Sequence, residues 1–88
     1  MPALSLSMTV RDSNGHEWTE TMDALDLIDP SDVGKRRPRN PRVQVTNATD
    51  AETYCTALLQ AFNDTRRNPK TPTRTLMAVV LKPRLESF

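Results

Sequence analysis

Alternating apolar and polar residues at the start of the chain predict a β-strand with one buried face. Apolar residues occupy the even positions from Leu4 to Val10, and serine or threonine separates them, which is the two-residue period of a strand. Residues 12–15, Asp-Ser-Asn-Gly, are typical of a turn. We therefore expect a β-hairpin whose second strand begins near Glu17.

The length of this turn determines which residues face one another across the hairpin. A two-residue turn would place Val10 opposite Thr19, an apolar side chain against a polar one. A three-residue loop that ends at Gly15, with Gly15 in the left-handed conformation, places Val10 opposite Trp18 instead. We predict this second register, which also pairs Leu6 with Met22 and Arg11 with Glu17.

The segment after the hairpin leaves two alternatives open. From Glu17 to Asp32 an acidic residue occurs at every third position, and apolar residues repeat with the same period. This spacing fits both a continued strand and a short helical turn. Residues 29–32 then predict a turn, and glycine and proline exclude regular structure from the loop at 33–41.

A long helix is expected in the second half of the chain. Thr49 and Glu52 have the spacing of a capping box, in which each side chain accepts a hydrogen bond from the backbone amide of the other residue. Apolar residues from Ala51 to Phe62 follow a helical period. Pro69 then ends the segment, so we expect a helix that begins within a residue or two of Thr49.

Two further strands complete the predicted fold. Residues 42–46 alternate with Val43 and Val45 inward, and residues 75–81 contain an apolar run that predicts a central strand buried on both faces. We predict an α+β fold, an N-terminal β-hairpin followed by a β-α-β unit, with one long helix packed on a small mixed sheet. One helix covers only one face, so residues 25–28 or the second subunit of a homodimer must cover the other.

Charge is distributed unevenly over the single domain that 88 residues allow. Residues 1–32, the acidic hairpin half, contain one basic and seven acidic residues, whereas residues 33–88 contain eleven basic and four acidic residues. The net charge of +1 hides this difference. The expected order along the chain is the acidic half, a basic loop at 33–42, the β-α-β unit at 42–82 and a short tail at 83–88.

Two loops rich in arginine hold the candidate binding residues. The planar guanidinium group suits phosphate. In a β-α-β crossover both strands start at one edge of the sheet and the helix ends there, so we expect both loops to form one basic pole that binds nucleic acid. The candidates are Lys35, Arg36, Arg37, Arg39 and Arg42 in the first loop, and Arg66, Arg67, Lys70 and Arg74 in the second.

Residues that would support catalysis are scarce. With one histidine, His16, and one cysteine, Cys55, no spacing indicates a nucleophile with its base, and two glycines cannot form a phosphate-binding loop. Cys55 lies on the apolar stripe of the helix, where a buried thiol is expected. The acidic residues at 17–32 have no spacing that fixes a cluster of metal ligands. We expect no catalytic residues, no cofactor and no metal site.

These features favour a binding protein. We expect a non-enzymatic accessory module that contacts the phosphates of nucleic acid through its arginine-rich loops. The alternative is a protein-binding module, namely an inhibitor, an adaptor or a self-assembling subunit, that uses complementary acidic and basic surfaces. No apolar run is long enough for a membrane span and the first ten residues do not resemble a signal peptide, so we expect an intracellular protein, cytoplasmic or nuclear.

Overall fold

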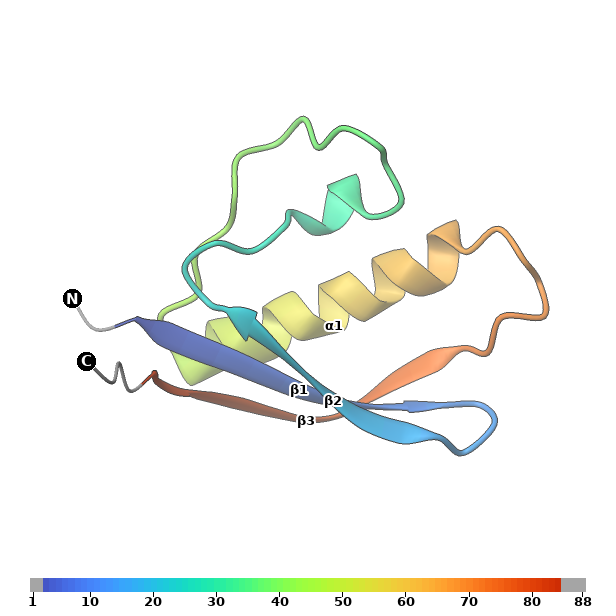
Figure 1. The fold of residues 1–88 in the computed structure, drawn as a ribbon, viewed down its shortest axis with the longest axis horizontal. Coiled ribbons are helices and arrows are strands. Elements are labelled where there is room, and N and C mark those ends of the chain that lie inside the picture. The colour runs from blue at the N-terminus through green and yellow to red at the C-terminus, as the bar shows by residue number, and fades with distance from the viewer. Residues whose placement is uncertain (1–2, 85–88) are drawn as a thin grey trace.

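The fold is a three-stranded antiparallel sheet with one long helix packed against it (Figure 1). A computed structural model describes residues 3–84, and residues 85–88 of the predicted tail lie outside this range. The strands are β1 (Leu4–Asp12), β2 (Glu17–Asp23) and β3 (Arg74–Pro83), the helix is α1 (Ala48–Thr65), and a 3₁₀ turn, η1, spans Pro30–Asp32. The α+β fold predicted from the sequence is confirmed.

The hairpin has the predicted register. Val10 lies opposite Trp18, and the other predicted pairs, Leu6 with Met22 and Arg11 with Glu17, also form. Gly15 has a φ of 88°, and its N–H donates to the carbonyl of Asp12. A residue with a side chain rarely adopts this conformation, so glycine at this position permits the loop that sets the register.

The predicted mixed sheet is wrong, because β3 runs antiparallel to β1 and every pair of strands is antiparallel. The predicted strand at 42–46 does not form; Val43 makes only an isolated bridge with Leu27, and the N–H of Val45 donates to the carbonyl of Ala24. The central strand is β1, and β2 and β3 already occupy its two sides. Residues 42–46 pair instead with the segment that leaves the hairpin.

The last strand is also not the central strand that its apolar run predicts. It lies at the edge of the sheet, and Met77 and Val80 are 43% and 48% exposed. Leu76, Val79 and Leu81 are half-buried and pack against the core. An apolar run can therefore occupy an edge strand with only one of its faces covered.

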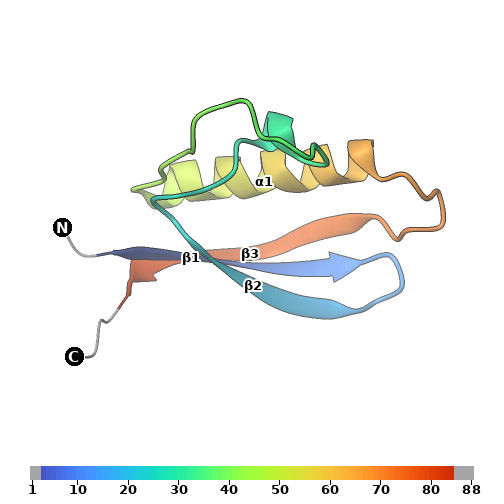
Figure 2. The same ribbon diagram turned by 45° about the horizontal axis from the view of Figure 1, so that its top comes forward.

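The core lies between the sheet and α1. Its residues come from β1, from α1 and from the segment after the hairpin: Leu6, Met8, Val10, Ala24, Leu27, Val45, Ala51, Tyr54, Cys55 and Leu59. Residues 24–47 run along α1, and the helix separates them from β3 in both views (Figures 1 and 2). The Tyr54 hydroxyl donates to the carbonyl of Ile28. Residues 25–28 therefore pack against the helix. The alternative that placed them on the second face of the sheet is wrong.

The helix begins at Ala48, within the predicted range, but a different residue caps it. Asn47 Oδ1 accepts from the Asp50 amide at 2.8 Å, and Asn47 Nδ2 donates to the Asp50 carboxylate at 2.9 Å. The predicted capping box of Thr49 and Glu52 is wrong, because both residues lie inside the helix. Asn47 has the extended backbone of an N-cap residue, and its side chain accepts from the Asp50 amide in the first turn. Thr49 lies inside the helix and so cannot be the cap.

Replacing Asn47 with alanine should lower the free energy of unfolding by about 1 kcal/mol, because the Asp50 amide loses its acceptor. Urea unfolding followed by circular dichroism measures this change. Thr49→Ala is the matched control and should change stability by less than about 0.5 kcal/mol, because Thr49 has no capping role here. Equal effects of the two substitutions would contradict the assignment of the cap.

Candidate functional site

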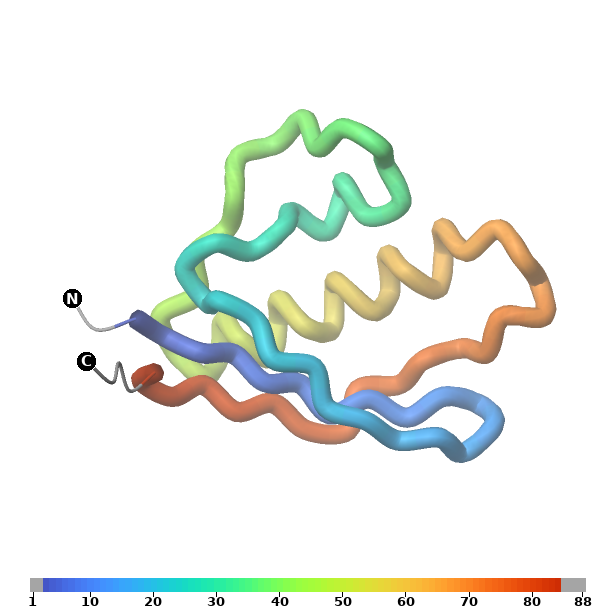
Figure 3. Tube along the Cα trace, in the orientation of Figure 1, coloured from blue at the N-terminus to red at the C-terminus, as the bar shows by residue number. Residues whose placement is uncertain are grey.

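A basic pocket forms where the tip of segment 24–47 meets the end of α1. Gly34 has a φ of 82°, and a Cβ atom at this position would lie 3.5 Å from Thr65 Oγ1, in the last turn of the helix. The tube in Figure 3 shows this tip beside the C-terminal end of α1. The basic loop that follows Gly34 therefore lies beside the chain that leaves the helix.

Five cationic side chains line this pocket. The cavity has a volume of about 700 Å³, and its lining residues are Gly34, Lys35, Arg36, Arg37, Arg39 and Arg67. None of these residues is acidic, and all of them are exposed. We call this cavity the basic pocket. Positive charges around a concave surface reinforce one another and attract anions.

A buried carboxylate holds the basic loop in place. Asp32 is fully buried, and its Oδ2 accepts from the backbone N–H of Asn40 at 3.0 Å, while its Oδ1 accepts from Asn40 Nδ2 at 3.2 Å. Lys35 Nζ lies 4.0 Å from Asp32 Oδ1, and the Lys35 N–H donates to the Asp32 carbonyl. These contacts tie both ends of the loop at 33–40 to one residue.

The same contacts favour the ionised form of Asp32. The hydrogen bond from the backbone N–H of Asn40 is the main cause that lowers the pKa of this carboxyl below its ordinary value of 3.8. Burial acts in the opposite direction, and the charge of Lys35 lowers the pKa further. Asp32 therefore remains a negatively charged anchor under the loop at neutral pH.

The structure gathers five of the nine predicted binding residues in the basic pocket. Arg42 instead lies 3.7 Å from Asp26, and Arg66 donates to Thr73 at 3.0 Å. Lys70 is exposed but does not line the pocket. The predicted convergence of the two loops is thus achieved in part, through the path of residues 24–47 and not through a parallel crossover.

Arg74 has a structural position that the sequence did not indicate. Its guanidinium carbon lies 3.9 Å from the centre of the Phe62 ring and 5.0 Å from that of Trp18. Cation–π contacts of this kind hold the side chain over the two rings. Its backbone N–H and carbonyl are both bonded to the side chain of Asn63. Arg74 therefore belongs to the packing between α1 and the sheet.

The acidic residues of segment 17–32 mostly serve local structure. Asp29 caps η1 by accepting from the amide and hydroxyl of Ser31, and Asp23 accepts from the amide of Leu25. Within residues 3–84, the ion pairs between this segment and the predicted binding residues are Arg42 with Asp26 and Lys35 with Asp32. The guanidinium groups of the basic pocket make no ion pair within these residues.

The single cysteine and the single histidine lie apart from the basic pocket. Cys55 is buried in the core, and this burial raises the pKa of its thiol to about 11. His16 is exposed at the hairpin turn, 3.8 Å from Asp12. In the described part of the chain, no three His, Cys, Asp or Glu side chains are grouped in a way that could bind a metal ion.

The anchor of the pocket, Asp32 with Asn40, was not among the predicted site residues. In the sequence Asp32 is one of seven acidic residues in the first 32, and nothing in its spacing sets it apart.

No helix among residues 3–84 has the length and hydropathy that a membrane crossing requires. Comparisons with protein-family models, with curated proteins and with solved structures found no match.

Proposed function

We propose that the chain binds nucleic acid through the phosphate backbone, at the basic pocket. The observation that supports this proposal is the group of five cationic side chains around one cavity of about 700 Å³ with no acidic residue in its lining. Binding of a polyanion to such a site releases condensed counterions, which favours association at low salt. The four arginines also offer planar donors that match phosphate oxygens.

The arrangement favours contacts with phosphates over contacts with bases. Among the described residues, the aromatic rings are those of Trp18, Tyr54 and Phe62, and none of them lines the basic pocket. Arg74 covers two of these rings, and Tyr54 is buried in the core. Without a ring on which bases stack, binding should depend little on sequence.

The proposed role is that of a non-enzymatic accessory module. Four of the five cationic side chains that line the pocket are arginines, and a guanidinium group does not act as a general base because it stays protonated. The alternative is a protein-binding module whose partner presents an acidic surface. The exposed carboxylate of Asp23 favours this alternative, since it makes no ion pair within residues 3–84 and offers a partner a negative charge outside the pocket.

Binding to random-sequence DNA and RNA over a salt series tests the proposal. We expect measurable binding of a labelled duplex of about 20 base pairs at low salt, with a slope of log affinity against log salt of about −4 if four or five phosphates are contacted. Fluorescence anisotropy measures both quantities. Polyglutamate serves as the comparison. Absence of nucleic-acid binding at the lowest salt would overturn the proposal, and tighter binding of polyglutamate would favour the protein-binding alternative.

A further inference from the structure

The outer edge of β3 carries backbone groups that face away from the sheet. Arg84 N donates to the carbonyl of Ala3, and Lys82 and Val80 follow in the same register with β1. Because these groups alternate in direction along an antiparallel strand, the N–H and C=O groups of Val79 and Leu81 point to the outside. A register shift between Thr9 and Val10 changes which residues of β3 face β1. The N–H and C=O groups of Leu76 therefore point outward as well.

Both ends of this edge are closed. At the start of β3, the side-chain amide of Asn63 accepts from the N–H of Arg74 and donates to its carbonyl, each at 3.0 Å. One side chain thereby replaces a neighbouring strand at that residue. At the other end, Pro83 has no N–H to offer. The open edge is the stretch 76–81, which is entirely apolar.

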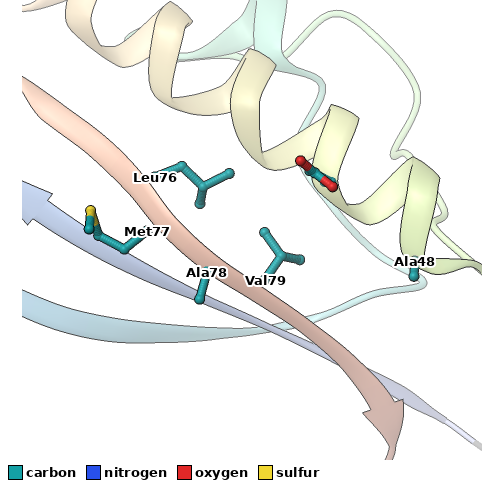
Figure 4. A pocket seen from close by; sticks show the side chains of 6 residues that line it. Ala48, Leu76, Met77, Ala78 and Val79 are labelled. Carbon is teal, nitrogen blue, oxygen red and sulfur yellow. The ribbon is translucent and has the colours of Figure 1, made fainter.

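A groove between the open edge and α1 gives room for another strand. One cavity of about 310 Å³ is lined by Leu76–Val79 together with Ala48 and Glu52, and a second of about 340 Å³ continues toward Asn63. Figure 4 shows Leu76 and Val79 directed toward the helix, whereas Met77 and Ala78 point away. A strand added to β3 would place every second side chain against the helix.

The charge beside the groove indicates what the added strand must carry. Glu52 is the one charged residue that lines the first cavity, it is exposed, and it makes no ion pair within residues 3–84. In a symmetric dimer, β3 of a second copy would pair with β3 about the middle of the open edge. This pairing would bring the two Glu52 side chains close to each other. Pairing with β2 of a second copy would add Glu20, another acid. Like charges oppose both arrangements.

We propose that the open edge of β3 binds an extended segment of another protein by strand addition, with apolar residues facing Leu76 and Val79 and a lysine or arginine facing Glu52. Main-chain hydrogen bonds to the outward groups of Leu76, Val79 and Leu81 supply the attachment. The apolar side chains cover the exposed apolar edge, and the ion pair with Glu52 selects the sequence. This surface is separate from the basic pocket, so it does not depend on nucleic-acid binding.

Two synthetic peptides test this proposal. Both are seven residues long, with threonine at the outward positions and valine at the second and sixth; the central residue is lysine in one and glutamate in the other. We expect amide chemical-shift changes at residues 76–81 with the lysine peptide, and about three- to fivefold weaker binding of the glutamate peptide. In Glu52→Lys the preference should reverse. Asp64→Lys, an equal change at an exposed helix position outside the groove, should leave the preference unchanged.

The remaining outcomes overturn the proposal. No shift change at about 2 mM peptide, equal binding of both peptides, or shifts confined to other residues would show that the edge does not select a basic strand. Sedimentation of the unmodified protein as a dimer that Val79→Pro converts to a monomer would show that a second copy occupies the edge. Retained binding of the lysine peptide by Val79→Pro would contradict the predicted main-chain pairing, since proline removes an outward N–H.

Discussion

Replacing Arg36, Arg37 and Arg39 with alanine should weaken nucleic-acid binding about tenfold or more at low salt, for every sequence tested. Each guanidinium that binds a phosphate contributes to counterion release, so the slope of log affinity against log salt should flatten by about one unit for each phosphate that the variant no longer binds. The three side chains are exposed and make no ion pair within residues 3–84. The melting temperature should therefore stay within a few degrees of its original value. Anisotropy over a salt series and thermal unfolding measure these quantities.

A second triple variant separates the basic pocket from overall charge. Exchange of Arg11, Lys82 and Arg84 for alanine also removes three positive charges and takes the formal net charge from +1 to −2, but none of these residues lines the pocket. We expect this control to keep most of the affinity. Equal reductions in affinity for the two variants would assign binding to net charge, and unchanged affinity in the first would lead us to abandon the proposed function.

Local pattern was sufficient for the elements whose partners are near in sequence. The match of Val10 with Trp18 and the conformation required at Gly15 fixed the hairpin register, because turn length and side-chain alternation act together. The apolar stripe of α1 likewise predicted the helix. The cap was missed by two residues, because Asn47 and Thr49 both have side chains suited to that position.

Pairing between distant segments was beyond the sequence pattern. Alternation at Val43 and Val45 is the same whether they join the sheet or pair with residues 24–27, and the observed pairing depends on contacts that the local pattern does not contain. The apolar run of β3 indicated burial on both faces, yet the strand lies at an edge. The local pattern predicted α1 and the three strands of the sheet, but it also predicted a strand at 42–46 that does not form, and the position of each strand depended on contacts across the whole chain.

The candidate site shows the same division. Clusters of basic residues were visible in the sequence, and five of the nine gather in one pocket. Arg74 and Arg42 do not line the pocket, because Arg74 lies over the Phe62 ring and Arg42 pairs with Asp26. Only the fold brings these partners near. Asp32 was indistinguishable from the other acids of its segment, because its role depends on its burial and on a hydrogen bond from Asn40, eight residues further along the chain.

Asp32→Asn should release the basic loop and lower the melting temperature by about 10 °C. Aspartate accepts with one oxygen from the backbone N–H of Asn40 and with the other from its side-chain amide, whereas asparagine has only one acceptor oxygen, so one of these donors loses its partner, and a buried donor without a partner is costly. Asp26→Asn is the matched control, since the Asp26 carboxylate is exposed and pairs with Arg42 at 3.7 Å; its melting temperature should change by no more than about 2 °C. Thermal unfolding and hydrogen exchange of the Asn40 amide measure the difference.

The pH dependence gives a second test of the same interaction. The pKa of Asp32 in the folded protein lies below its ordinary value of 3.8, so the carboxylate contributes stability above pH 3.8 and loses it as the pH falls through the lower, folded value. The difference in melting temperature between the unmodified protein and Asp32→Asn should therefore be largest near neutral pH and narrow below about pH 4. A difference that stays constant across this range would show that the charge of Asp32 is not what anchors the loop.

Nucleic-acid binding by Asp32→Asn separates charge from loop order. Removal of a negative charge under the pocket should by Coulomb attraction alone tighten binding. If the anchored loop holds Arg36, Arg37 and Arg39 in place, these side chains are less ordered in the free Asp32→Asn variant. Binding must then order them, which costs free energy, and we expect affinity to fall about fivefold. Asp26→Asn removes the same charge without releasing the loop and should not weaken binding. Tighter binding by Asp32→Asn, with the Asn40 amide still protected from exchange, would contradict the role assigned to Asp32.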